Sequence, residues 1–222
     1  MRVTALRVVV ASAAACASLA AAPSARADKF DETVDVALRL TGSWVVAREL
    51  ALAPVTTDDP LPALAAERPR LDGDGRSFGG LLRFGLGLDG LRFGAGAGAL
   101  RLAGLELVTD AGDGRAHGLE LGELWGLSFE VYAGYAFGSA RDVRPYLEAR
   151  GTVDVLFTRL TAEGSGRASL YAAAPGVALA AGLLLPVSQY FFADVGVAVA
   201  PYGPERLSLF GALGVPIPLA NL

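Results

Sequence analysis

The chain has 222 residues, of which 53% are hydrophobic, and it carries 19 Lys and Arg against 23 Asp and Glu. Its net charge of −4 disfavours nucleic acid as a partner. The single cysteine excludes a disulfide within the chain. The length suits one domain with a substantial core or one small barrel.

The amino-terminal 27 residues have the features of a secretory signal peptide. Arg2 and Arg7 form a basic start, and an apolar run follows from Val8 to Ala22. The segment Ala25-Arg26-Ala27 is then a small-x-small cleavage site. We therefore expect a cleaved, exported protein.

The remaining segment, 28–222, is expected to form a single domain of 195 residues with 16 basic and 23 acidic side chains. Cleavage would remove Cys16, which leaves no thiolate nucleophile and no cysteine metal site. Two alternatives are an uncleaved membrane anchor and a lipoprotein acylated at Cys16. The cysteine lacks the leucine usual three residues before it.

The first three predicted strands alternate between apolar and polar residues, as half-buried strands do. They cover 33–46, 76–88 and the segment from Leu91. A long polar loop with four prolines, about 47–75, separates the first two and has room for a short helix. Asp89-Gly90 between the second and third is a tight hairpin signal.

The next predicted strands form a hairpin, LSFEVYAGYAFGSARDVRPYLEARGTVDVLF, over 127–157. Polar loops are expected at about 103–118 before it and 160–168 after it, and strands six to eight at about 171–185, 189–200 and 206–215. The stretch 169–193 has no charged residue and resembles a transmembrane helix by hydropathy. Prolines and glycines interrupt it, which favours strands.

The count of eight strands and the order of the connections predict the fold class. Connections one, three and five are long and polar, whereas two, four and six are short. Outer-membrane barrels have long external loops and short periplasmic turns. The sequence therefore predicts an all-β, eight-stranded antiparallel up-and-down transmembrane barrel with both termini, and the turn 139–143, in the periplasm.

Aromatic residues are predicted to form two girdles at the ends of the strands, at the membrane interfaces. Phe210 is an exception to this pattern. The outer girdle comprises Trp44, Phe78, Trp125, Phe157, Tyr171 and Tyr202, and the inner one Phe84, Phe93, Tyr135, Phe137, Tyr146, Tyr190 and Phe191.

Charged residues on the other face of the strands are predicted to point into the barrel. An eight-stranded barrel is just wide enough for side chains to fill, and charges away from water must pair. We expect a salt-bridge plug, with a gated conduit for protons or small solutes as the alternative. The predicted set is Asp35, Arg39, Arg83, Arg92, Glu130, Glu148, Arg150 and Asp154.

The run Arg144-Pro145-Tyr146-Leu147 opens a predicted strand after a short turn. It resembles the Arg-Pro-Tyr strand start of small outer-membrane barrel families of the OmpA and OmpW type. The resemblance implies a porin-like barrel in a Gram-negative cell envelope. Two features depart from the family pattern: the last residue is Leu222 rather than an aromatic, and no peptidoglycan-binding domain follows the barrel.

Neither of two candidate chemical sites predicts a catalytic or metal residue. His117, the sole histidine, could assist Ser128 or Ser169 in a lipid hydrolase, but no Gly-x-Ser-x-Gly motif is present. The segment 72–75, Asp-Gly-Asp-Gly, resembles a calcium loop, but Arg76 stands where a third ligand belongs. We expect no cofactor.

The expected function is that of a non-enzymatic, monomeric outer-membrane protein, structural or binding through its external loops. Its expected partners are outer-membrane lipid and an extracellular ligand or surface partner of the loops 47–75, 103–118 and 160–168. Two alternatives are a lipid-modifying hydrolase of the same architecture and a soluble secreted barrel with an apolar ligand inside.

Overall fold

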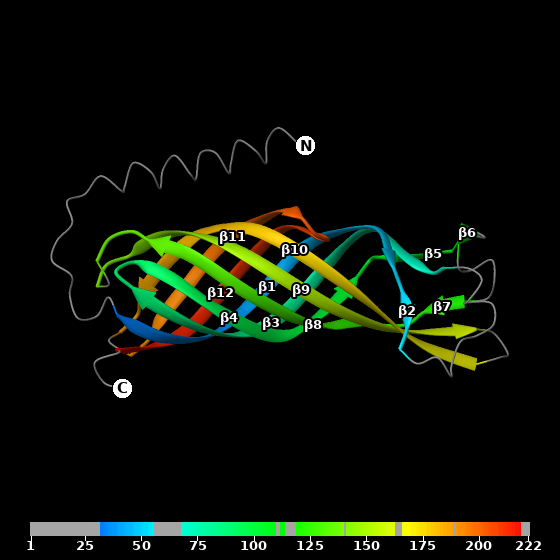
Figure 1. The fold of residues 1–222 in the computed structure, drawn as a ribbon, viewed down its shortest axis with the longest axis horizontal. Helices are drawn as coiled ribbons and strands as arrows, with labels where there is room; N and C mark the ends of the chain where they lie inside the picture. Colours follow the sequence, from blue (N-terminus) through cyan, green and yellow to red (C-terminus); the bar gives the residue numbers. More distant parts are fainter. Residues whose placement is uncertain are drawn as a thin grey trace.

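The computed structural model describes residues 32–55, 68–109, 112–113, 119–139, 141–162, 166–188 and 190–218. The predicted signal peptide and His117 lie outside these ranges. The described part of the chain consists of strands and their connections (Figure 1).

Eight long strands form the wall of the molecule. They are β1 (Thr33–Ala51), β3 (Arg70–Leu88), β4 (Leu91–Ala103), β8 (Leu124–Ala136), β9 (Arg144–Ala162), β10 (Gly166–Pro186), β11 (Phe192–Tyr202) and β12 (Glu205–Pro218). Four short strands extend the sheet beyond the wall at one end, namely β2 (Ala53–Pro54), β5 (Glu106–Thr109), β6 (Gly112–Asp113) and β7 (Leu119–Leu121).

The sheet closes on itself because β1 pairs with both β3 and β12. Around the ring each long strand pairs antiparallel with its neighbour in sequence. A closed barrel satisfies all the backbone groups of its wall within the sheet. The predicted eight-stranded up-and-down barrel is confirmed.

The two ends of the barrel differ. At one, here called the turn end, tight connections join the strands; Asp89 and Gly90 have φ of 53° and 83°, as a two-residue hairpin with both central residues left-handed requires. At the other, the loop end, β2, β5, β6 and β7 extend the sheet (Figure 1). Thr33 pairs with Pro218, so the described wall begins and finishes at the turn end.

Several strand boundaries were predicted too short at the loop end. β1 continues to Ala51 and β3 begins at Arg70, so the connection predicted over 47–75 is shorter than expected. β5 and β6 lie within the predicted loop 103–118, and β9 and β10 reach into 160–168. Cross-strand pairing holds these polar, glycine-containing segments extended although their own alternation is weak.

Two other sequence alternatives do not survive. The uncharged stretch 169–193 forms most of β10 and the start of β11. None of the described residues forms a helix long and apolar enough to cross a membrane. The acidic segment 72–75 is part of β3, where Asp72 pairs with Glu106 of β5, and is not a free loop.

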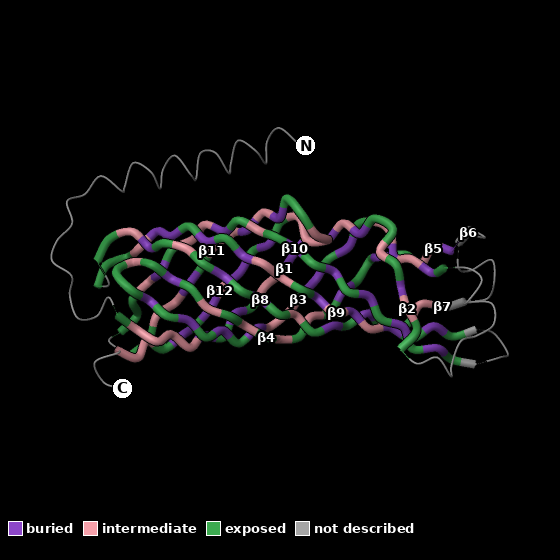
Figure 2. The backbone as a smooth tube through the Cα atoms, in the orientation of Figure 1, coloured by how far each residue is buried: buried purple, intermediate pink, exposed green. Residues whose placement is uncertain are grey.

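The outer surface of the barrel is apolar. Large exposed hydrophobic side chains come from all eight long strands, and along each strand they alternate with buried residues (Figure 2). On the β8–β9 hairpin Phe129, Val131 and Val153 are exposed, whereas Glu130 and Asp154 are buried. This is the inverse of a soluble sheet protein, and it contradicts the alternative of a soluble barrel with an apolar interior.

Val131 provides a test of this surface, because its side chain is 62% exposed near the middle of β8. Val131→Arg should lower the free energy of unfolding in lipid vesicles by about 2–4 kcal/mol, since an arginine would face hydrocarbon. Val143→Arg is the matched control, because Val143 is also exposed but lies in the turn before β9. Equal losses in the two variants would contradict the lipid contact of Val131.

Candidate functional site: the filled lumen

Three arginines and three carboxylates from six strands meet in the lumen. Glu130 and Glu148 are its centre: Arg83 contacts both, with Nε 2.8 Å from Glu130 Oε1 and Nη2 2.8 Å from Glu148 Oε1. Arg150 Nε donates to Glu148 Oε1 at 2.6 Å. The network is electrically balanced once Arg39 and Asp194 are added.

Arg39 joins the network across the barrel. Its guanidinium lies 3.4 Å from Glu130, 3.7 Å from Glu148 and 3.4 Å from Asp194, and the residue is only 1% exposed. Asp194 also accepts a hydrogen bond from the hydroxyl of Tyr146 at 2.6 Å. We call Arg39, Arg83, Glu130, Glu148, Arg150 and Asp194 the charge network.

Aromatic rings fill the space around the charge network. The guanidinium carbons of Arg39 and Arg150 lie 4.5 and 4.2 Å from the ring centroid of Phe210, and that of Arg83 lies 3.5 Å from Tyr132. Such contacts stabilise guanidinium groups that have left water.

Glycines on the facing strands make room for these rings. A Cβ on Gly94 would lie 2.7 Å from the Tyr132 hydroxyl, and one on Gly182 would lie 2.7 Å from the Tyr146 hydroxyl. Large and small residues therefore complement each other across the lumen. The glycines of β4 serve the close packing expected for the inside of a narrow barrel.

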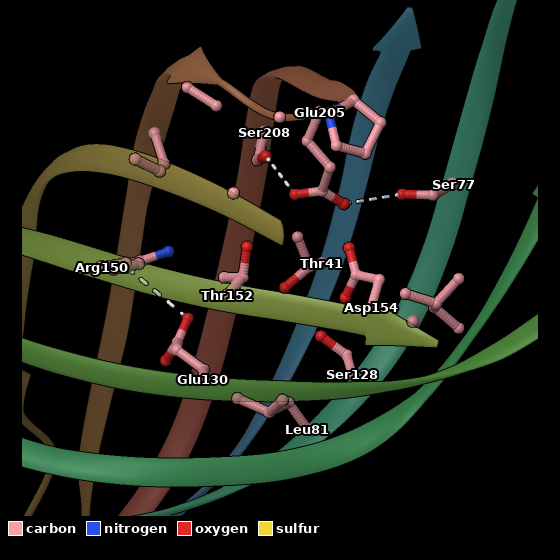
Figure 3. A pocket seen from close by; sticks show the side chains of 18 of the residues that line it. Thr41, Ser77, Leu81, Ser128, Glu130, Arg150, Thr152, Asp154, Glu205 and Ser208 are labelled. Atoms are coloured by element: carbon pink, nitrogen blue, oxygen red, sulfur yellow. Dashed lines mark hydrogen bonds and ion pairs between the residues drawn. The ribbon is translucent and has the colours of Figure 1, made fainter. Parts of the chain in front are cut away.

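A small polar cavity of about 70 Å³ lies on the loop-end side of the charge network (Figure 3). Glu205 accepts hydrogen bonds there from Ser77 at 3.1 Å and Ser208 at 3.3 Å. Asp154 is 5% exposed and is hydrogen-bonded to Ser128. The cavity has room for only a few water molecules.

An apolar cluster lines the lumen nearer still to the loop end. Its inward-facing leucines, among them Leu71, Leu102, Leu124, Leu156 and Leu160, are at most 6% exposed. They belong to β3, β4, β8 and β9. From the turn end the interior thus passes from charged to polar to apolar.

The predicted lumen residues are all directed inward, but they do not form a single group. Arg39, Arg83, Glu130, Glu148 and Arg150 come together in the charge network. Asp154 lies one layer away among hydroxyls, and Arg92 is buried with its guanidinium 5.2 Å from the Tyr146 ring. Asp35 is half-buried near the turn end and accepts a hydrogen bond from Thr33.

Tyr146 was wrongly assigned to the inner aromatic girdle. It is 1% exposed because it is the inward residue of the β9 start, where its hydroxyl reaches Asp194. The remaining predicted girdle residues have half-buried or exposed side chains: Trp44, Phe78, Phe84, Phe93, Trp125, Tyr135, Phe137, Phe157, Tyr171, Tyr190, Phe191 and Tyr202. Trp125 and Phe157 stack with ring centroids 4.8 Å apart.

Sequence reasoning missed Asp194 and the role of Phe210. On β11, Val195 and Val197 alternate with Asp194 and Gly196, so the alternation could have placed Asp194 inside. Phe210, the exception to the girdles, lies inside at 6% exposure against two arginines. No group of three metal-ligating side chains occurs within the described ranges.

The closed wall, the apolar exterior and the charged interior decide where this chain works. Only helices and closed barrels can cross a bilayer with every backbone group paired, and apolar-out, polar-in strands are the mark of outer-membrane barrels. The chain is a small bacterial outer-membrane β-barrel.

Comparison with solved structures finds barrels of the same kind. Neisserial surface protein A is 16% identical over 83% of this chain and 97% of its own, with a TM-score of 0.45. The N-terminal β-barrel domain of Pseudomonas aeruginosa OprF is 16% identical over 84% and 99%, also at 0.45. Ail of Yersinia pestis, solved with the heparin analogue sucrose octasulfate, is 12% identical over 84% and 99%, again at 0.45.

No protein-family model and no curated protein matches the barrel. The likeness to solved structures concerns the fold and not a shared activity.

The charge network predicts a difference between two arginine substitutions. Arg39→Met should lower the free energy of unfolding by about 3–5 kcal/mol, because it leaves buried carboxylates without a partner. Arg101→Met removes an exposed ion pair with Glu123 of 2.6 Å and should cost no more than about 1 kcal/mol. Denaturant unfolding in lipid vesicles measures both, and equal costs would contradict the importance of the lumen pairs.

Proposed function

We propose that this protein is a non-enzymatic outer-membrane barrel whose lumen is plugged and whose external loops carry its binding activity. The observation that carries the proposal is the filled interior. The charge network, the aromatic rings and the apolar cluster occupy successive levels of the barrel, and the polar cavity between them measures only about 70 Å³. Such an interior supports a plug better than a conduit.

The balance of charge in the lumen favours a structural role. The three guanidinium groups face three carboxylates, so the network has no surplus charge to select a passing ion. A catalytic role for a lumen carboxylate would require access from outside, and Glu130, Glu148 and Asp194 are at most 7% exposed. The charges therefore serve to hold the strands in one arrangement.

The orientation follows from the difference between the two ends. We infer that the loop end faces the cell exterior and the turn end faces the periplasm, after removal of residues 1–27 as a signal peptide. Longer extracellular loops and short periplasmic turns are general in bacterial barrels. An extracellular ligand or surface partner would then meet the segments 47–75, 103–118 and 160–168.

Conductance provides the test of the plug. The wild-type protein in a planar lipid bilayer should give no sustained current above that of the bare membrane, whereas a large porin reconstituted in the same way should. Heat-modifiable migration on gels should accompany this result as evidence of a folded barrel. A stable, stepwise current from the folded protein would contradict the plug.

Epitope insertion tests the orientation independently. A tag placed within 56–67 should bind antibody on intact cells, because this segment connects β2 to β3 at the loop end. A tag placed in the turn 139–143 should bind antibody only after the outer membrane is opened. The reverse pattern would invert the proposed orientation.

A further inference from the structure

Exposed arginines are confined to one end of the barrel wall. Among the described residues of the long strands, the fully exposed basic side chains are Arg48, Arg76, Arg101, Arg159 and Arg167. All five lie in the loop-end half of their strands, on β1, β3, β4, β9 and β10. The remaining strand arginines near the middle and the turn end are buried or half-buried.

These arginines lie at the boundary of the apolar surface. Arg76 pairs with Trp44, and Arg101 pairs with both Phe78 and Trp125. Exposed aromatic residues mark the level where hydrocarbon gives way to headgroups. Arginines interleaved with them, or one step further out, therefore lie at headgroup height.

Arg159 and Arg167 form the closest pair of this group in the sheet. Arg159 follows Phe157 on the outward face of β9, and its partner on β10 is Ser169. Arg167 lies two residues beyond Ser169 on the same face, so the two arginines are diagonal neighbours, with about 7–8 Å between their positions. Two guanidinium groups at this spacing can share one phosphate or two adjacent ones.

Most of these guanidinium groups lack a protein carboxylate. Arg101 pairs with Glu123 at 2.6 Å. Arg48, Arg76, Arg159 and Arg167 form no ion pair with another residue of the described ranges. Guanidinium groups match phosphate oxygens in charge and in bidentate geometry, so an anionic headgroup would supply what the protein does not.

We propose that Arg159 and Arg167, supported by Arg48, Arg76 and Arg101, form an arginine collar that binds the phosphate groups of the glycolipid in the outer leaflet. The collar rests on the proposed orientation, because it requires the loop end to meet that leaflet. Its confinement to one end fits a membrane whose two leaflets differ in charge. The collar would hold the barrel at a defined depth and surround it with a fixed lipid shell.

Binding of fluorescent lipid A to the folded protein in neutral detergent micelles tests the collar. The double variant Arg159→Gln/Arg167→Gln should weaken binding about thirtyfold, from the typical contribution of two arginines at an anionic surface. Arg141→Gln is the control; it removes an exposed arginine from the connection before β9 at the turn end and should leave binding unchanged. Wild-type affinity in the double variant would overturn the collar.

Two further arms separate the source of the phosphate and the proposed orientation. Dephosphorylated lipid A should bind as weakly as the double variant, and equal binding of the two lipids would overturn phosphate recognition. Soluble glucose phosphate should not compete at millimolar concentration, and full competition would overturn the commitment to a lipid. Heat-modifiable migration of the double variant shows a folded barrel, so loss of lipid binding in it is distinct from failure of the barrel itself.

Discussion

The pairing of buried guanidinium and carboxylate groups is the interaction on which the rest of the structure depends. A barrel with an apolar exterior can place its charges only inside, where they are costly unless each has partners. Glu130 and Glu148 meet this requirement by each contacting three arginines. The network ties strands β1, β3, β8, β9 and β11 together across the lumen, which cross-strand hydrogen bonds between neighbours cannot do.

The narrow interior governs which residues can surround this network. Tyr132, Tyr146 and Phe210 occupy space that facing glycines leave empty, and a single Cβ at Gly94 or Gly182 would collide with a tyrosine hydroxyl. The glycines of β4 weaken that strand by propensity, yet they permit the rings that cover the arginines. Local preference is thus given up for packing across the barrel.

The loop end obeys a different rule from the middle of the barrel. There the inward residues are leucines and alanines that pack on each other, and the strands continue past the aromatic level instead of ending in loops. This apolar cluster gives the extended strands a core of their own. It also closes the lumen without charged groups, so the plug and the support of the external segments are the same structure.

The sequence by itself determined the fold class, the faces of the strands and most of the lumen charges, because side chains alternate strictly along a strand and lipid tolerates only one kind of face. Asp89-Gly90 and the alternation around Glu130 and Arg150 are local signals that need no partner to be interpreted. The extent of β3, β9 and β10 depended instead on pairing between strands distant in sequence. Only the tertiary structure decided that Asp194 and Tyr146 complete the charge network and that Asp154 does not join it, since these outcomes depend on the stagger of strands around a closed barrel.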